Sequence, residues 1–193
     1  MRYKEYNINK VLEKCIPVFW EKGFRGCSIQ EIVKVTGVNR FSLYHEFQNK
    51  EGILYNSLKL YDERYSKQKF DLLKKEGELK NVLQEFYLSF LQNKDEFQGC
   101  FYIHIGTELA DDDLEIKKLI KTYLSNLELI ISERLQKENS TKEDASFYAR
   151  HLVGLFCTSM SFCLIHSEKE KEKHIANGIQ VILNKKINYA TSS

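Results

Sequence analysis

The sequence predicts an all-α protein with about nine helices, divided into an N-terminal three-helix domain (residues 1–52) and a C-terminal helical domain (residues 53–193). The chain contains a single Pro and nine Gly, too few for a β protein rich in turns. Apolar residues recur at spacings of three and four through most of the chain, which indicates amphipathic helices. At 193 residues the chain is long enough to bury a substantial core.

The first predicted helix spans residues 9–22 and ends at Gly23. Val11, Cys15 and Phe19 form one apolar stripe along it. Pro17 lies inside this stretch, where it removes a backbone donor, so we expect it to kink or shorten the helix.

Residues 28–51 predict two short helices joined by a tight turn. Ser28 and Glu31 have the spacing of a capping box, which satisfies two backbone N–H groups at a helix start. Gly37 stands where that helix should end and the backbone needs a positive φ. Asn39 is a suitable N-cap for the second helix. This arrangement is a helix-turn-helix, whose second helix enters the DNA major groove.

The second of these helices has a buried face and an outward face. Leu43 and Phe47, four residues apart, share the buried face. Outward arginine can contact guanine, an outward phenylalanine can touch a thymine methyl, and tyrosine or lysine can bind phosphate oxygens. On spacing alone, an ordinary helical corner with a solvated arginine remains an alternative. The candidate DNA-binding residues are Ser28, Asn39, Arg40, Phe41, Ser42, Tyr44, His45 and Lys50.

A longer stretch resembles the TetR/AcrR family of one-component repressors. The similarity is carried by Val18-Phe-Trp-Glu-Lys-Gly-Phe-Arg-Gly-Cys-Ser-Ile and by Gly37-Val-Asn-Arg-Phe-Ser-Leu-Tyr-His-Glu-Phe-Gln-Asn-Lys-Glu-Gly-Ile-Leu, and it covers about residues 8–60. A second patch, Gly99-Cys-Phe-Tyr-Ile with Glu108-Leu, is similar to a Gly-Cys-Leu segment found in one branch of that family. The resemblance implies a dimer with an N-terminal DNA-binding domain and a C-terminal ligand-binding and dimerisation domain. Phe41 departs from the family pattern, in which this position is often small or polar.

Charge and cysteine content fit an intracellular DNA-binding protein. Residues 1–60 carry ten Lys and Arg against six Asp and Glu, a balance of +4, whereas the whole chain has a net charge of +2. The N-terminus has no apolar leader and no run approaches a membrane span, so we expect a cytoplasmic protein with no membrane contact. Five cysteines without a Cys-x-x-Cys pair indicate free thiols.

The segment from Leu152 to Ile165 is apolar nearly all round, so it must be buried on several sides. One side can cover the core of its own chain and another can meet a second chain, which predicts a homodimer. A central core helix of a monomer is the alternative. The candidate dimer residues are Leu152, Phe156, Met160, Cys163, Ile175, Ile179 and Ile182.

Aromatic residues are concentrated in the first half of the C-terminal domain, together with a few polar groups, as is usual in small-molecule sites. Plain core packing is the alternative for each of them. The candidate ligand-binding residues are Phe86, Tyr87, Phe90, Cys100, Phe101, His104 and Tyr123.

The sequence contains no phosphate loop, no nucleophile elbow and no zinc-protease motif, and its histidines lack zinc spacing. We therefore expect no enzyme activity, no metal and no cofactor. The sequence favours a dimeric repressor of the TetR type that binds palindromic operator DNA and is released by a small apolar or aromatic effector. Two alternatives remain: a thiol-responsive DNA-binding sensor in which His104 favours the thiolate of Cys100, and a helical interaction module without DNA binding.

Overall fold

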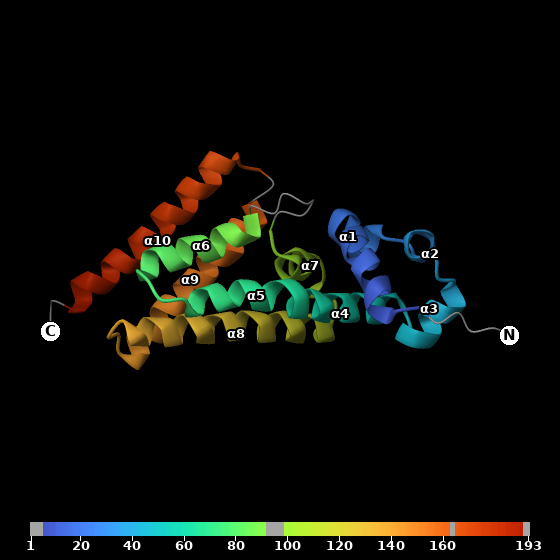
Figure 1. Ribbon diagram of the computed structural model, residues 1–193, viewed down its shortest axis with the longest axis horizontal. Helices are drawn as coiled ribbons and strands as arrows, with labels where there is room; N and C mark the ends of the chain where they lie inside the picture. The colour runs from blue at the N-terminus through green and yellow to red at the C-terminus, as the bar shows by residue number, and fades with distance from the viewer. Residues whose placement is uncertain (1–5, 92–98, 163–164, 191–193) are drawn as a thin grey trace.

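The computed structural model describes residues 6–91, 99–162 and 165–190, and within these ranges the chain is helical with no strand. It forms an elongated molecule with a small helical unit at one end (Figure 1). That unit contains α1 (Ile8–Gly26), α2 (Ile29–Thr36) and α3 (Arg40–Phe47).

A long helical rod connects this unit to the rest of the molecule. The rod is built from α4 (Lys50–Tyr61), a π-helical segment η1 (Asp62–Ser66), α5 (Lys67–Phe70) and a 3-10 segment η2 (Asp71–Lys74). The backbone stays in the right-handed helical region at each junction, so the segments continue one another. The rod runs beside α8 (Figure 1).

The remaining helices form the C-terminal bundle. They are α6 (Leu79–Leu91), α7 (Phe101–Leu109), α8 (Leu114–Lys137), α9 (Lys142–Phe162) and α10 (Glu168–Ala190). The helix α9 packs against α6, α7, α8 and α10, which explains the apolar residues of its C-terminal half. The helix α7 stands between α1 and this bundle and contacts both α1 and α8 (Figure 1).

Pro17 does not end α1, which corrects the expectation that it would shorten the helix. The backbone leaves helical geometry at Gly23 instead, with φ 69° and ψ 175°. Buried side chains on both sides of Pro17, including Ile16 and Phe19, hold the helix in place across the missing hydrogen bond. The sequence predicts that Gly23 ends the first helix, and the structure confirms that the helical geometry breaks at this residue.

One continuous core runs through the described residues of both domains. Phe19, Leu43, Leu58, Phe86 and Phe156 are all fully buried in it. Within the described ranges, no helix is long and apolar enough to cross a membrane.

The residues predicted to pair two chains lie in this core, not on the surface. Leu152, Phe156, Met160, Ile175 and Ile179 are at most 4% exposed within the single chain, so they are not free to contact a second one. The prediction of these five as interface residues is therefore wrong. An apolar helix buried by its own chain and one buried by a partner have the same sequence pattern. Ile182 is half-buried, and Cys163 lies outside the described residues.

Candidate nucleic-acid interface and regulatory core

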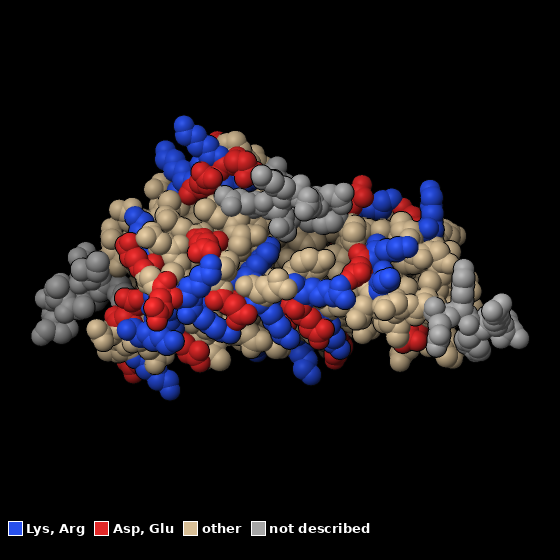
Figure 2. All heavy atoms as spheres, viewed as in Figure 1, with Lys and Arg blue, Asp and Glu red and all other residues tan. Residues whose placement is uncertain are grey.

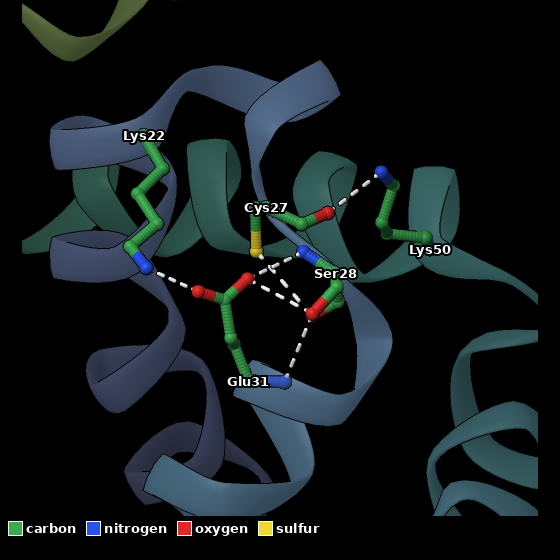
Figure 3. Close-up of polar contacts among 5 residues, drawn as sticks. All are labelled: Lys22, Cys27, Ser28, Glu31 and Lys50. Carbon is green, nitrogen blue, oxygen red and sulfur yellow. Dashed lines mark hydrogen bonds and ion pairs between the residues drawn. The ribbon is translucent and has the colours of Figure 1, made fainter.

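The start of α2 is held by the predicted capping box, which the structure confirms (Figure 3). The Ser28 hydroxyl accepts a hydrogen bond from the Glu31 N–H at 3.3 Å, and the Ser28 N–H donates to the Glu31 carboxylate at 2.8 Å. The same carboxylate pairs with the Lys22 ammonium on α1. The Lys22 and Ser28 donors lower the pKa of Glu31 to about 2, so its charge persists at neutral pH. This pairing fixes α2 against α1.

The turn between α2 and α3 also forms as predicted. Gly37 adopts φ 73°, and its N–H closes α2 on the Val33 carbonyl. The Asn39 side chain accepts from the Ser42 N–H at 2.8 Å and begins α3. Because its amide oxygen caps the helix, Asn39 acts first as a structural residue.

The helix α3 is buried on one face and open on the other. Leu43 and Phe47 are 0% and 6% exposed and lock α3 into the core. On the opposite face Phe41 is 71% exposed, an unusual state for a phenylalanine. The exposed His45 ring stacks beside it with 6.3 Å between centroids.

The remaining candidates on α3 flank this open face. The guanidinium of exposed Arg40 lies 5.0 Å from the centre of the half-buried Tyr44 ring, which fixes its direction. Ser42 is half-buried, and its carbonyl accepts a hydrogen bond from the Tyr6 hydroxyl at 3.0 Å. Sequence reasoning missed Tyr6 because it lies far from α3 in the chain and has no local pattern.

Lys50 has a structural role that the sequence did not indicate. Its ammonium donates at 2.8 Å to the carbonyl of Phe24 and at 2.8 Å to that of Cys27, and Figure 3 shows the second of these bonds. It also lies 4.1 Å from the centre of the Phe24 ring. An ammonium has three donors, so one remains for a phosphate. The last turn of α1 has carbonyls without helical partners, and Lys50 satisfies them.

A carboxylate from the C-terminal bundle contacts the N-terminal unit directly. Glu108 on α7 accepts hydrogen bonds from the backbone N–H groups of Phe24 and Arg25, both at 2.8 Å. These donors follow the break at Gly23. The Arg25 guanidinium pairs with Asp112, just beyond α7. These contacts connect the end of α1 to α7.

The predicted aromatic residues come together in the core of the bundle. Phe86, Phe90 and Phe156 meet with ring centroids 5.0–5.5 Å apart. Tyr102 and Tyr123 stack nearly parallel at 4.2 Å. Of the predicted ligand-binding residues, Phe86, Tyr87, Phe90 and Phe101 are completely buried.

Cys100 and His104 do not form the pair that the thiol hypothesis required. The Cys100 thiol donates to the Tyr123 hydroxyl at 3.3 Å, and burial raises the pKa of the thiol. The His104 ring instead stacks on Trp20 of α1, with 6.5 Å between centroids. Burial lowers the pKa of His104, which favours the neutral imidazole. The expected thiolate stabilised by His104 is therefore a wrong prediction, because desolvation disfavours the charged form of both groups.

One depression in the described surface is large enough for a small molecule. It lies between the rod and α8, has a volume of about 330 Å³, and is bounded by Lys59, Asp62, Glu115 and Lys118 with the Tyr102 and Tyr123 rings among its lining. A second cavity, among α6, α9 and α10, is about 30 Å³ and has room for a water. Positive and negative side chains intermingle over the face seen in Figure 2.

The family model for bacterial regulatory proteins of the TetR family matches residues 12–55, the region that contains α2 and α3. The family model therefore places the N-terminal region of this chain in the TetR family of transcriptional regulators. It is 30% identical over 125 residues to the transcriptional repressor ComR of Escherichia coli, an alignment that covers 63% of this chain and 60% of ComR. It is 24% identical over 167 residues to IcaR of Staphylococcus aureus, a negative transcriptional regulator of a biofilm operon, covering 83% and 86% of the two chains.

Solved structures of TetR family regulators share the fold of this chain. The TetR family regulator CifR, in a cysteine-substituted form bound to operator DNA, superposes with a TM-score of 0.82 over 93% of this chain and 98% of CifR at 14% identity. The reduced form of E. coli NemR gives 0.70 over 92% and 95% at 18% identity. These relatives are regulators and not enzymes. In the part of the chain that the structure describes, no three His, Cys, Asp or Glu side chains gather as a metal site.

Proposed function

We propose that this TetR family member is a dimeric repressor that binds palindromic operator DNA through α3 and is released by a small-molecule effector. The observation that carries the proposal is the open face of α3, where Phe41 and His45 project while Leu43 and Phe47 anchor the helix. A recognition helix must be rigid and have side chains free to reach base edges. We assign residues 1–52 to the DNA-binding domain and residues 53–193 to the regulatory domain.

The contacts on DNA divide by chemistry. Phe41 can touch a thymine methyl, Arg40 can bind guanine, and His45 lies beside them as a further base or phosphate contact. Tyr44, Ser28 and the third donor of Lys50 suit phosphate oxygens. The modest excess of positive charge in the first 60 residues supports this assignment.

We propose that the second chain pairs through the outer faces of α9 and α10. Phe147 is 57% exposed on α9, and its ring lies beside those of Tyr148 and His151 on the same helix, with 4.3 Å between its centroid and that of His151. Val181 on the adjoining α10 is 58% exposed. Exposed apolar side chains on adjacent helices indicate a protein contact. A two-fold dimer also presents two copies of α3 to two half-sites.

The effector would act on the regulatory domain and change its position relative to α1. The contact of Glu108 with the end of α1 supports a mechanical connection between the domains. An effector that prefers one arrangement by about 1–3 kcal/mol changes DNA affinity by fivefold to 150-fold. Reversible binding is favoured over thiol chemistry because the Cys100 thiol is buried and its pKa is raised.

Binding to mixed-sequence duplex DNA, measured by fluorescence anisotropy over a range of salt concentrations, tests the proposal. We expect wild-type affinity to fall steeply with salt. Tyr44→Phe, which removes a hydroxyl assigned to a phosphate, should weaken this binding, whereas Lys137→Ala, at the end of α8 far from α3, should not (Figure 1). Absence of salt-dependent binding in the wild type would overturn the DNA-binding role and favour a helical interaction module.

A further inference from the structure

Asp62, the first residue of the π-helical segment η1, has a carboxylate that the described chain leaves without a partner. Its side chain makes no hydrogen bond and no ion pair within the described residues. Asp62 is half-buried, and burial raises the pKa of its carboxyl in spite of the positive charge of nearby Lys67. The carboxylate has therefore lost part of its water without gaining a donor in exchange. Short π-helical segments within longer helices are frequent at functional sites.

The hydroxyl of Tyr102 on α7 lies near this carboxylate and is also without a partner. Tyr102 is 4% exposed, and its hydroxyl makes no hydrogen bond in the part of the chain that the structure describes. Burial, and next the negative charge of Asp62, raise the pKa of Tyr102, so the two groups lie close enough to interact. A buried tyrosine hydroxyl usually has a hydrogen-bond partner. A carboxylate and a hydroxyl oxygen are thus available together to accept hydrogen bonds from a ligand.

Both residues line the groove of about 330 Å³ between the rod and α8. Lys59, Glu115 and Lys118 also line this groove, and like Asp62 they form no ion pair with described residues. These three side chains are exposed and keep their water, whereas Asp62 is partly removed from it. The charge that gains most from a ligand is therefore the negative one of Asp62.

The aromatic lining favours the same kind of ligand. The rings of Tyr102 and Tyr123 line the groove and stack on each other at 4.2 Å. Tyrosine rings attract organic cations, and more strongly where water is excluded. An anionic ligand would be repelled by Asp62 and would meet the two lysines only where water competes with it.

We propose that this groove binds the effector and that the effector is an organic cation, an amine with an aromatic or apolar body. Its ammonium donates hydrogen bonds to the Asp62 carboxylate and to the Tyr102 hydroxyl oxygen, since an ammonium has donors and no acceptor. Its body packs on the tyrosine stack and on Leu119 of α8. This inference rests on the proposed effector-binding function.

The position of the groove connects such a ligand to the DNA-binding unit. The rod and α8 are joined on both sides of residues 59–62. The Tyr55 hydroxyl donates to Asp113 at 2.6 Å, and the Tyr123 hydroxyl donates to Ser66 at 3.3 Å. A ligand held between these contacts would move the rod relative to α8, and the rod begins with α4, which directly follows α3 (Figure 1).

Three naphthalene probes that differ in charge test the proposal. At neutral pH, 1-naphthylmethylamine is a cation, 1-naphthalenemethanol is neutral and 1-naphthaleneacetate is an anion. Calorimetric titration of the full-length protein gives the dissociation constant of each. We expect the wild type to bind the amine most tightly. Asp62→Asn should weaken amine binding by about tenfold, the lower value for a hydrogen bond to a charged group because Asp62 is only half-buried, and leave the alcohol unchanged. Tyr102→Phe should weaken amine binding by about two- to tenfold.

Glu63→Gln is the matched control. It removes the same single negative charge from the next residue of η1, but Glu63 is exposed and does not line the groove, so amine binding should stay as in the wild type. Thermal unfolding checks that Asp62→Asn is folded, and it should be at least as stable as the wild type because its carboxylate has no partner. The proposal is overturned if the wild type does not prefer the amine, if Asp62→Asn binds the amine like the wild type, or if Glu63→Gln weakens amine binding as much.

DNA binding on the same samples separates this proposal from the DNA-binding function. Without probe, absence of salt-dependent DNA binding would refute the DNA-binding function, while calorimetry still decides whether the groove binds cations. With operator sequences enriched from a random DNA pool, the amine should release wild-type protein from DNA, and Asp62→Asn should need about tenfold more amine. Unchanged operator affinity at saturating amine would overturn the role of this cation site in regulation.

Discussion

The contact between Glu108 and the end of α1 predicts that one carboxylate on α7 stabilises the junction of the two domains. Glu108 accepts hydrogen bonds from the N–H groups of Phe24 and Arg25, immediately after the non-helical Gly23. Removing the carboxylate in Glu108→Ala leaves both donors without a protein partner. The same substitution should loosen α7 from α1 of the N-terminal unit.

The magnitude follows from the two hydrogen bonds. A hydrogen bond to a charged group contributes about 1.5–3 kcal/mol. Arg25 is exposed and Phe24 is half-buried, so water replaces part of the loss and the two bonds together contribute about as much as one fully buried bond. We expect Glu108→Ala to lower the free energy of unfolding by about 1.5–3 kcal/mol, which corresponds to a fall in Tm of about 3–12 °C for a chain of this size.

Gly23 provides an internal test of the same geometry. A Cβ built at Gly23 would lie 2.7 Å from the Glu108 carboxylate, and its φ of 69° is strained for any other residue. Gly23→Ala should therefore displace the carboxylate as well as strain the backbone, at about 1–3 kcal/mol for the strain alone. In the Glu108→Ala background only the strain remains, so the double variant should be less destabilised than the sum of the single variants.

Urea unfolding of the single and double variants measures these free energies. Glu133→Ala is the matched control, because Glu133 is exposed on α8 and has no polar contact within the described residues. If Glu108→Ala is as stable as Glu133→Ala, or if the two single effects add within about 0.5 kcal/mol, the contact does not join the domains as described.

Four further predictions concern DNA binding, assembly and charge. Arg40→Ala should cost about 1–3 kcal/mol at one base pair of each half-site, measured with singly substituted operators, and uniform weakening would make Arg40 a phosphate contact instead. Phe147→Glu should stay folded and sediment as a monomer. Phe156→Glu should instead unfold the chain, because Phe156 is 0% exposed. If Phe147→Glu forms folded dimers, α9 is not the interface. Lys50→Ala should lower the salt slope of DNA binding by about one unit. It should also lower the thermal stability, because Lys50 hydrogen-bonds the end of α1, and unchanged stability would contradict these bonds. Folding lowers the pKa of Lys69 from 10.5 to about 8, so the free-energy penalty of burying its charge is fully present below pH 8. Lys69→Met should therefore be more stable than wild type at pH 7, and this excess should shrink by about 1.4 kcal/mol per pH unit between pH 8 and about 10. An excess that does not change with pH would refute the burial of the charge.

The helix-turn-helix could be predicted because its determinants are local. Ser28 and Glu31 lie three residues apart and bind each other, and Gly37 needs only its own backbone to end α2. Asn39 caps the helix that begins one residue later. The outward direction of Phe41 follows from the periodicity of a helix anchored by its opposite face.

The remaining parts of the site depend on contacts between distant residues, which no spacing rule reports. Lys50 is satisfied by carbonyls at the end of α1, and Tyr6 reaches the middle of α3. Glu108 belongs to a segment that resembles the family, but its role follows only from the position of α7 against α1. Nothing in the sequence distinguishes Lys69, because the residues around it form an ordinary charged helix and only the fold buries its nitrogen.

The residues predicted to form the dimer interface show what an apolar sequence pattern cannot distinguish. The sequence predicted that α9 is buried on several sides, and the structure surrounds it with four helices of the same chain. The pattern does not distinguish a partner from the chain's own core, because both bury apolar area in the same way. The proposed interface is based instead on the solvent-exposed side chains of Phe147 and Val181.

Selection of bound sequences from a random pool of duplex DNA tests the central claim most directly, because it measures sequence preference, symmetry and half-site spacing together. The account predicts enrichment of a palindrome whose two half-sites are read by the two copies of α3. It also predicts that Phe41→Ala protein selects the same spacing with a relaxed preference at one position per half-site. Enrichment of no sequence, or of one that is unchanged by both Arg40→Ala and Phe41→Ala, would contradict the assignment of α3 as the recognition helix.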